Sequence, residues 1–168
     1  MRLLILFGLA TYAALLIQTA VPLWLPYRAL LPNLIIILTV DLGLRHHGAF
    51  AALIAFLIGY ATDAFAGTHL GMNAFLTTFI FLLTYQISSR LLVTNALVGA
   101  IAVFFAVYLA DIGAVVNAAG RGASHAINAM VPSMLLQSFI SALVAPIVFA
   151  ILAGAKRVIG LPHRLERE

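Results

Sequence analysis

The chain has 168 residues, of which 64% are hydrophobic and only 8% are charged. A soluble domain carries about 25% charged residues, so this composition excludes a soluble globular domain and indicates a membrane protein. The net charge of +4 comes from basic residues scattered at the ends of apolar runs, which is typical of membrane topology signals and not of nucleic-acid binding. Cysteine is absent, which excludes disulfides, thiolate metal sites and cysteine nucleophiles.

Six apolar segments follow one another along the chain, each near the ~20 residues that a membrane-spanning helix needs. The second segment is short for a full span, and snorkelling of Arg28 and Arg45 would extend it. Residues 67–71 alone join the third and fourth segments, which predicts a tight antiparallel hairpin. We therefore expect an all-α fold, a six-helix transmembrane bundle forming one integral membrane domain over residues 1–168. The spans are predicted at about 3–21, 30–44, 48–66, 72–88, 95–117 and 131–155.

The basic residues predict the orientation of this bundle. With the N-terminus inside, two of them, Arg28 and Arg121, lie outside, and seven lie on the cytoplasmic side. This asymmetry follows the positive-inside rule, so both termini are predicted to be cytoplasmic. A cleaved signal peptide over residues 1–20 is the alternative, but the apolar run is long for one. The seven cytoplasmic residues are Arg2, Arg45, Arg90, Lys156, Arg157, Arg164 and Arg167.

The third segment carries a charged residue within a row of small residues spaced four apart. A carboxylate at membrane depth costs at least ~2.5 kcal/mol, which makes Asp63 the most informative residue of the chain. Small residues at this spacing let two helices approach closely. Asp63 could also accept hydrogen bonds from backbone N–H groups around residues 67–71, at the start of the fourth helix. The row consists of Ala51, Ala55, Gly59, Asp63, Gly67 and Gly71.

Two further aspartates lie in or beside the spans. Asp41 precedes Arg45 by four residues, a spacing that predicts an ion pair at the membrane interface. Asp111 lies in the fifth span, ~24 Å from its inner end, close to the ~22 Å of Asp63 in the third span. The two outer acids could bind a cation or proton, form a catalytic pair, or anchor loops or a partner helix with Arg28 or Arg121. We favour a structural or partner-anchoring role for these two aspartates over cation or proton binding and over catalysis.

Signals for catalysis or metal binding are missing. No zinc-binding HExxH motif occurs. The serines in or beside the spans have no nearby histidine in sequence, namely Ser88, Ser89, Ser133, Ser138 and Ser141. The histidines lie in loops or at the termini without a convergent set, and His69 alone is close enough to Asp63 to be tested as its partner. We therefore predict no catalytic, metal-binding or cofactor-binding residues.

Three sequence features follow one another along the chain. Leu31-Pro32-Asn33 opens the second span, residues 59–71 carry a G-x3-D-x3-G-x2-LG stretch, and Asp111 lies in the fifth span. Together with the chain length and the number of spans, these features resemble the MreD family of bacterial rod-shape membrane proteins. The resemblance carries structural or partner-packing roles onto Pro32, Asn33, Gly59, Asp63, Gly67, Gly71 and Asp111.

The resemblance implies a scaffold without an activity of its own in the bacterial inner membrane. MreD-like proteins join MreC, the actin-like MreB, the RodA glycan polymerase and its transpeptidase partner in the elongation machinery that inserts peptidoglycan along the side wall. The substrate-binding subunits of energy-coupling-factor vitamin transporters are similar in fold and size. A small-molecule-binding subunit of such a transporter is therefore the alternative function.

Overall fold

A computed structural model describes residues 2–20, 30–46, 48–66, 71–90, 96–120 and 127–158, with the side chains of 90, 96, 117–120 and 127–131 left undescribed. These residues form six helices that overlap the six predicted segments. Their ends differ by a few residues, and the second helix begins later than predicted because Asn33 caps it. The helices are α1 (Arg2–Ala20), α2 (Leu34–Arg45), α3 (Ala49–Ala66), α4 (Met72–Arg90), α5 (Ala96–Gly120) and α6 (Ile127–Val158).

α2 is the centre of the molecule and contacts each of the other five helices. It has 12 residues, of which all from Ile35 to Gly43 are buried. A helix that is apolar around its whole circumference belongs in a core, which explains this position. At 1.5 Å per residue α2 is about 18 Å long, well short of the ~30 Å hydrocarbon thickness of a bilayer.

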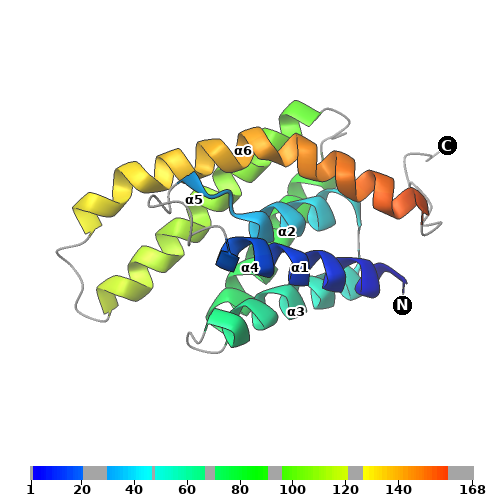
Figure 1. Ribbon diagram of the computed structural model, residues 1–168, viewed down its shortest axis with the longest axis horizontal. Helices are drawn as coiled ribbons and strands as arrows, with labels where there is room; N and C mark the ends of the chain where they lie inside the picture. Colours follow the sequence, from blue (N-terminus) through cyan, green and yellow to red (C-terminus); the bar gives the residue numbers. More distant parts are fainter. Residues whose placement is uncertain are drawn as a thin grey trace.

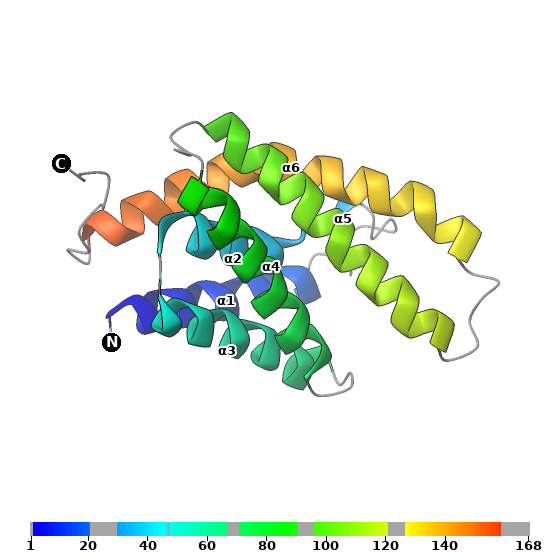
Figure 2. The same ribbon diagram turned by 180° about the vertical axis from the view of Figure 1, so that it is seen from behind.

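The other helices surround α2 in two groups. α1 and α3 lie side by side on one side of α2, and α5 and α6 pack together on the other side. α4 lies beside α2, between these two pairs of helices (Figures 1 and 2). One apolar cluster joins α2 to α1 and α3, and a second joins α2 to α4, α5 and α6. The start of α1 and the end of α6 lie at the same end of the molecule (Figure 1). We call this end of the molecule the inner end, because the distribution of basic residues predicts that it faces the cytoplasm.

Four of the helices are long and apolar enough to cross a membrane, namely α1, α3, α5 and α6. α2 is too short, and α4 is more polar because it carries Asn73, several threonines and Gln86. The sequence predicted six spans, and length and composition support four of them. The protein is therefore a multi-pass membrane protein.

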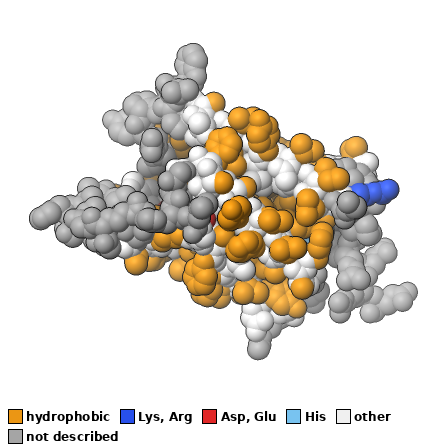
Figure 3. Space-filling view, turned by 90° about the horizontal axis from the view of Figure 1, so that it is seen from below, with side chains coloured by type: hydrophobic (Ala, Val, Ile, Leu, Met, Phe, Trp, Pro, Cys, Tyr) orange, Lys and Arg blue, Asp and Glu red, His pale blue; other side chains and the backbone are white. Residues whose placement is uncertain are grey.

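The outer surface of the helices is apolar. On α6, Phe139, Leu143, Ile147 and Ile151 are exposed at a spacing of four residues, and large side chains of α5 such as Phe105 are exposed in the same way. On the opposite side of the molecule, the face beneath α3 in Figure 1 is also dominated by hydrophobic side chains, with Lys and Arg side chains confined to one edge (Figure 3). Such continuous apolar stripes suit contact with lipid or with other membrane helices.

Candidate functional site

The carboxylate of Asp63 lies at the junction of α3 and α4, and the residue is 0% exposed. Its Oδ2 accepts hydrogen bonds from the backbone N–H groups of Gly71 at 2.9 Å and Ala74 at 3.2 Å. Its Oδ1 accepts from the backbone N–H of Asn73 at 3.2 Å and from the Asn73 side-chain amide at 2.8 Å. Both oxygens are thus occupied by donors from the start of α4.

This arrangement is a helix cap supplied by a neighbouring helix. The first N–H groups of an α-helix have no partner within the helix, and a negative charge there is favoured by the helix dipole. Asp63 satisfies these groups in α4, as the capping interpretation of its position anticipated. Gly71 precedes α4 with φ of +102°, a conformation that residues with a Cβ adopt rarely. The hydrogen bonds explain how a carboxylate is tolerated inside an apolar bundle.

One turn below Asp63, α3 and α4 approach each other closely at Gly59. A Cβ at Gly59 would lie 2.6 Å from Ala74 Cα and would also overlap the Asn73 carbonyl oxygen and the Thr77 hydroxyl. The Thr77 Oγ1 lies 3.0 Å from the Ala55 carbonyl oxygen of α3, within donating distance. Ala55 and Gly59 of the row therefore face α4 inside the protein. Gly67 and His69 lie outside the described residues.

A second polar cluster closes the inner end of the bundle. Asp41 on α2 pairs with Arg45 Nε at 2.7 Å, which confirms the predicted ion pair. Lys156 near the end of α6 pairs with the other carboxylate oxygen at 2.5 Å, and its ammonium lies 5.3 Å from the centre of the Phe7 ring. Lys156 is only 4% exposed. The sequence did not reveal this partner, because 115 positions separate the two residues and no local spacing connects them.

The start of α2 is held by its own N-cap and by two neighbouring helices. The Asn33 side chain accepts from the backbone N–H of Ile36 at 3.3 Å, as an N-cap residue does. The backbone N–H of Asn33 donates to Ser141 Oγ of α6 at 2.9 Å, and Gln18 of α1 donates to the Pro32 carbonyl oxygen at 3.3 Å. Pro32 and Asn33 thus connect α1, α2 and α6 at one point.

Asp111 is not brought to Asp63 by any described contact. It lies on α5, which packs mainly against α6 and α2, whereas Asp63 is held by α4. Asp111 is partly buried, and its Oδ2 is shielded from solvent without a hydrogen-bond partner in the described part of the chain. The geometry therefore separates the two outer acids into different local sites.

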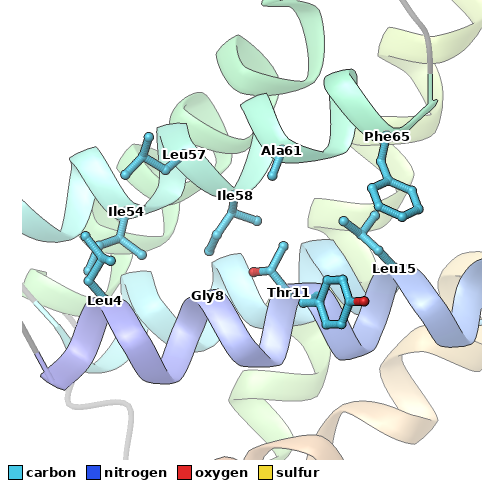
Figure 4. A pocket seen from close by; sticks show the side chains of 10 residues that line it. Leu4, Gly8, Thr11, Leu15, Ile54, Leu57, Ile58, Ala61 and Phe65 are labelled. Atoms are coloured by element: carbon cyan, nitrogen blue, oxygen red, sulfur yellow. The ribbon is translucent and has the colours of Figure 1, made fainter.

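An apolar groove of about 300 Å³ runs between α1 and α3. In Figure 4, Leu4, Gly8, Thr11 and Leu15 of α1 face Ile54, Leu57, Ile58, Ala61 and Phe65 of α3. The Thr11 hydroxyl donates to the Phe7 carbonyl oxygen of its own helix at 2.7 Å. The groove thus offers shape and apolar surface and little chemistry. Within the described ranges, no three His, Asp or Glu residues are grouped so as to hold a metal ion.

Comparison with known families decides the assignment. The family described as rod shape-determining protein MreD matches residues 1–154, which include all six helices except the last residues of α6. The chain belongs to the MreD family. It is therefore a rod-shape-determining membrane protein associated with the rod-shape machinery. No curated protein and no solved structure matches the chain.

Proposed function

We propose that this MreD family member is a non-enzymatic adaptor of the bacterial elongation machinery in the cytoplasmic membrane. In this proposal it binds the membrane helix of an MreC-like partner and supports side-wall peptidoglycan synthesis and rod shape. MreB, RodA and a transpeptidase are the further partners expected in the same assembly. Both termini are cytoplasmic in the proposed orientation.

The observation that carries this proposal is the environment of Asp63. Its two oxygens accept hydrogen bonds from Gly71 and from three donors in the first turn of α4, so the carboxylate holds two helices together. Asp41 is likewise engaged by Arg45 and Lys156. The two fully buried acids of the described chain thus stabilise the bundle, which suits a scaffold whose work is done by its surface.

The charge distribution supports the proposed orientation. Arg45, Lys156 and Arg157 lie at the inner end of α2 and α6, in the last turns of their helices. Positive residues flank membrane helices mainly on the cytoplasmic side. The end of the molecule where α1 begins and α6 ends is therefore assigned to the cytoplasm.

Affinity purification from the native host tests the proposal. The chain is tagged at its C-terminus, membranes are crosslinked mildly, and co-purifying proteins are identified by mass spectrometry. We expect an MreC-like protein together with wall-synthesis enzymes. Recovery of ATPase subunits with a coupling membrane protein would overturn the adaptor in favour of the small-molecule-binding subunit of an energy-coupling-factor-type transporter.

A further inference from the structure

The apolar groove between α1 and α3 extends outward from the inner end of the molecule. Leu4 lies opposite Ile54 at one end of the groove, and Leu15 lies near Phe65 at the other (Figure 4). Leu4 is the third residue of α1, which begins at the inner end. Each wall of the groove covers about 16 Å of helix. One leaflet of a bilayer contributes about 15 Å of hydrocarbon, so the groove is as long as the acyl chains of the inner leaflet.

The groove is narrow and open along its side. Its floor is formed by the buried Ile54 and Ile58, and its rims by the exposed Leu4 and Leu57. Gly8 leaves the middle unfilled, because a Cβ there would meet nothing within 4 Å. A volume of about 300 Å³ spread over this length is much narrower than an α-helix, whose diameter with side chains is about 10 Å. The groove therefore fits one extended hydrocarbon chain better than a whole helix.

The inner end, where the groove opens, carries an excess of positive charge. Over the whole sequence, the predicted inner side has seven basic and three acidic residues, which leaves four positive charges in excess. The three acidic residues are Asp41, Glu166 and Glu168. Arg2 precedes the first groove residue of α1 by two positions, and its side chain is exposed. A negatively charged group is therefore favoured at the opening of the groove.

α1 also connects the groove to a basic cluster at this end. The ring of Phe7, one turn from Leu4, lies 5.3 Å from the Lys156 ammonium. Lys156 shares the carboxylate of Asp41 with Arg45, so two cations contact one anion. The opening of the groove thus lies beside a cluster whose contacts leave one positive charge over.

We propose that the groove between α1 and α3 binds an anionic glycerophospholipid of the cytoplasmic leaflet. One acyl chain lies between the two helices, and the phosphate of the head group lies at the inner end, where Arg2 contacts it. Basic residues near the membrane surface attract anionic lipids, and each buried CH2 group of the chain adds to the binding. A lipid held in this way is a component of the protein itself and is independent of the partner that the adaptor binds.

Native mass spectrometry of the purified full chain tests this site. The protein in detergent is titrated with phosphatidylglycerol or phosphatidylethanolamine carrying the same acyl chains, and the dissociation constants are compared. Gly8→Leu and Ala61→Leu add bulk to the two walls of the groove, and Arg2→Gln removes the charge at its opening. Ala150→Leu and Arg157→Gln make matched changes at exposed positions of α6, which does not line the groove. The melting temperature of each variant is measured as well.

We expect the wild-type protein to bind phosphatidylglycerol about fivefold more tightly than phosphatidylethanolamine, the contribution of one arginine near an anionic head group. Gly8→Leu and Ala61→Leu should weaken the binding of both lipids about tenfold or more, because CH2 groups of the chain lose their place in the groove. Arg2→Gln should lose most of the preference for phosphatidylglycerol and still bind both lipids. The two α6 variants should bind as the wild type does.

Three results would overturn the inference. Equal lipid binding by wild type, Gly8→Leu and Ala61→Leu would place the lipid elsewhere on the protein. Equal affinity of the wild type for the two lipids would exclude an anionic head-group site. Unchanged lipid binding by Gly8→Leu, together with loss of the membrane partner in the crosslinking experiment, would assign the groove to the helix of that partner. If one groove variant melts well below the wild type, the variant on the other wall decides.

Discussion

Asp63 shows how one side chain connects two helices through backbone donors. Its partners lie 8 to 11 residues ahead in the sequence, across the α3–α4 turn. Because the turn is short, the sequence already placed the carboxylate near the start of α4, and the capping arrangement was predictable. The structure further shows that both carboxylate oxygens accept hydrogen bonds. The number of donors that a substitution leaves unpaired therefore determines how much stability it costs.

Different substitutions of Asp63 should therefore lower the stability of the protein by different amounts. An unsatisfied buried donor costs about 1 to 3 kcal/mol. Asp63→Leu leaves several donors unpaired, and we expect its stability to fall by more than about 3 kcal/mol on this scale. Asp63→Asn keeps one accepting oxygen but turns an NH2 group toward two donors, so we expect a smaller loss of stability, about 1 to 3 kcal/mol. Thermal unfolding in detergent, followed by helical circular dichroism, measures both losses.

Shape complementation in a strain that lacks the gene extends this test to function. Asp63→Asn should restore rod shape in part, and Asp63→Leu should fail to restore it. Full and equal rescue by both variants would contradict a structural role for the carboxylate.

Lys156 illustrates what the sequence leaves hidden at the residue scale. The pair of Asp41 and Arg45 was predictable from its spacing of four on one helix, whereas Lys156 comes from the far end of the chain. In the sequence it is one of several basic residues after an apolar run, and its burial depends on how α6 crosses α2 and α1. Only the tertiary arrangement distinguishes it from the exposed Arg157 next to it.

At the scale of helices, α3 and α4 pack closely because small residues line their contact. Gly59 sits against backbone atoms of α4, which have no freedom to move aside. Gly43 on α2 meets α4 in the same manner, since a Cβ there would lie 2.9 Å from Thr84 Cβ and 3.1 Å from the Phe81 carbonyl oxygen. The four-residue spacing predicted the first contact, while the second is a single glycine that no pattern marks.

Two glycine-to-alanine substitutions test this contrast. Gly59→Ala should destabilise the protein by about 1 to 3 kcal/mol, the usual cost of overpacking. Gly8→Ala should be neutral or stabilise by up to about 1 kcal/mol, because alanine is the better helix former. A Cβ at Gly8 meets nothing within 4 Å, so this variant is a matched control. Unfolding temperatures that fall equally in both variants would argue against a special contact at Gly59.

The inner ends of α2 and α6 are joined by the ion pair of Asp41 and Lys156. Breaking a buried pair by removing one partner costs about 3 to 5 kcal/mol, and Arg45 remains beside Asp41, so we expect Lys156→Met to cost about 2 kcal/mol. The double variant Asp41→Asn/Lys156→Met should recover part of this loss, because no buried charge is left behind. Arg157→Met serves as the control at an exposed position. If the double variant is less stable than Lys156→Met alone, the loss of stability in Lys156→Met does not come from the broken ion pair with Asp41.

For the molecule as a whole, the number and order of the helices followed from the apolar segments, whereas their roles did not. The sequence treats α2 as a shortened span, and the structure makes it the core around which the others pack. Hydropathy cannot separate a buried helix from a lipid-facing one, because both are apolar. Asp111 and Asp63 also lie at contacts between different pairs of helices. This separation depends on how the helices pack, which the spacing of residues in the sequence does not encode.

The orientation of the whole molecule can be measured by cysteine labelling, which is clean because the chain has no cysteine of its own. Ala49→Cys, at the start of α3, should react with a membrane-impermeant maleimide only after the cells are permeabilised. Ala123→Cys, between α5 and α6, should react in intact cells. The reverse pattern would place the basic end outside and refute the proposed topology.

The shortness of α2 has a consequence for how the protein is made. A helix of 12 residues cannot be left alone in the bilayer by the insertion machinery, since its ends would carry unpaired backbone groups within the hydrocarbon. We therefore expect α2 to leave the translocation channel in company with α1 and α3, against which it packs through apolar side chains. The polar contacts at its two ends form only after α6 has followed, because Ser141 and Lys156 belong to that helix. Integration of α2 into the membrane should therefore depend on the later segments of the chain. In a nascent protein arrested before α3, we expect that α2 is not yet stably integrated in the membrane.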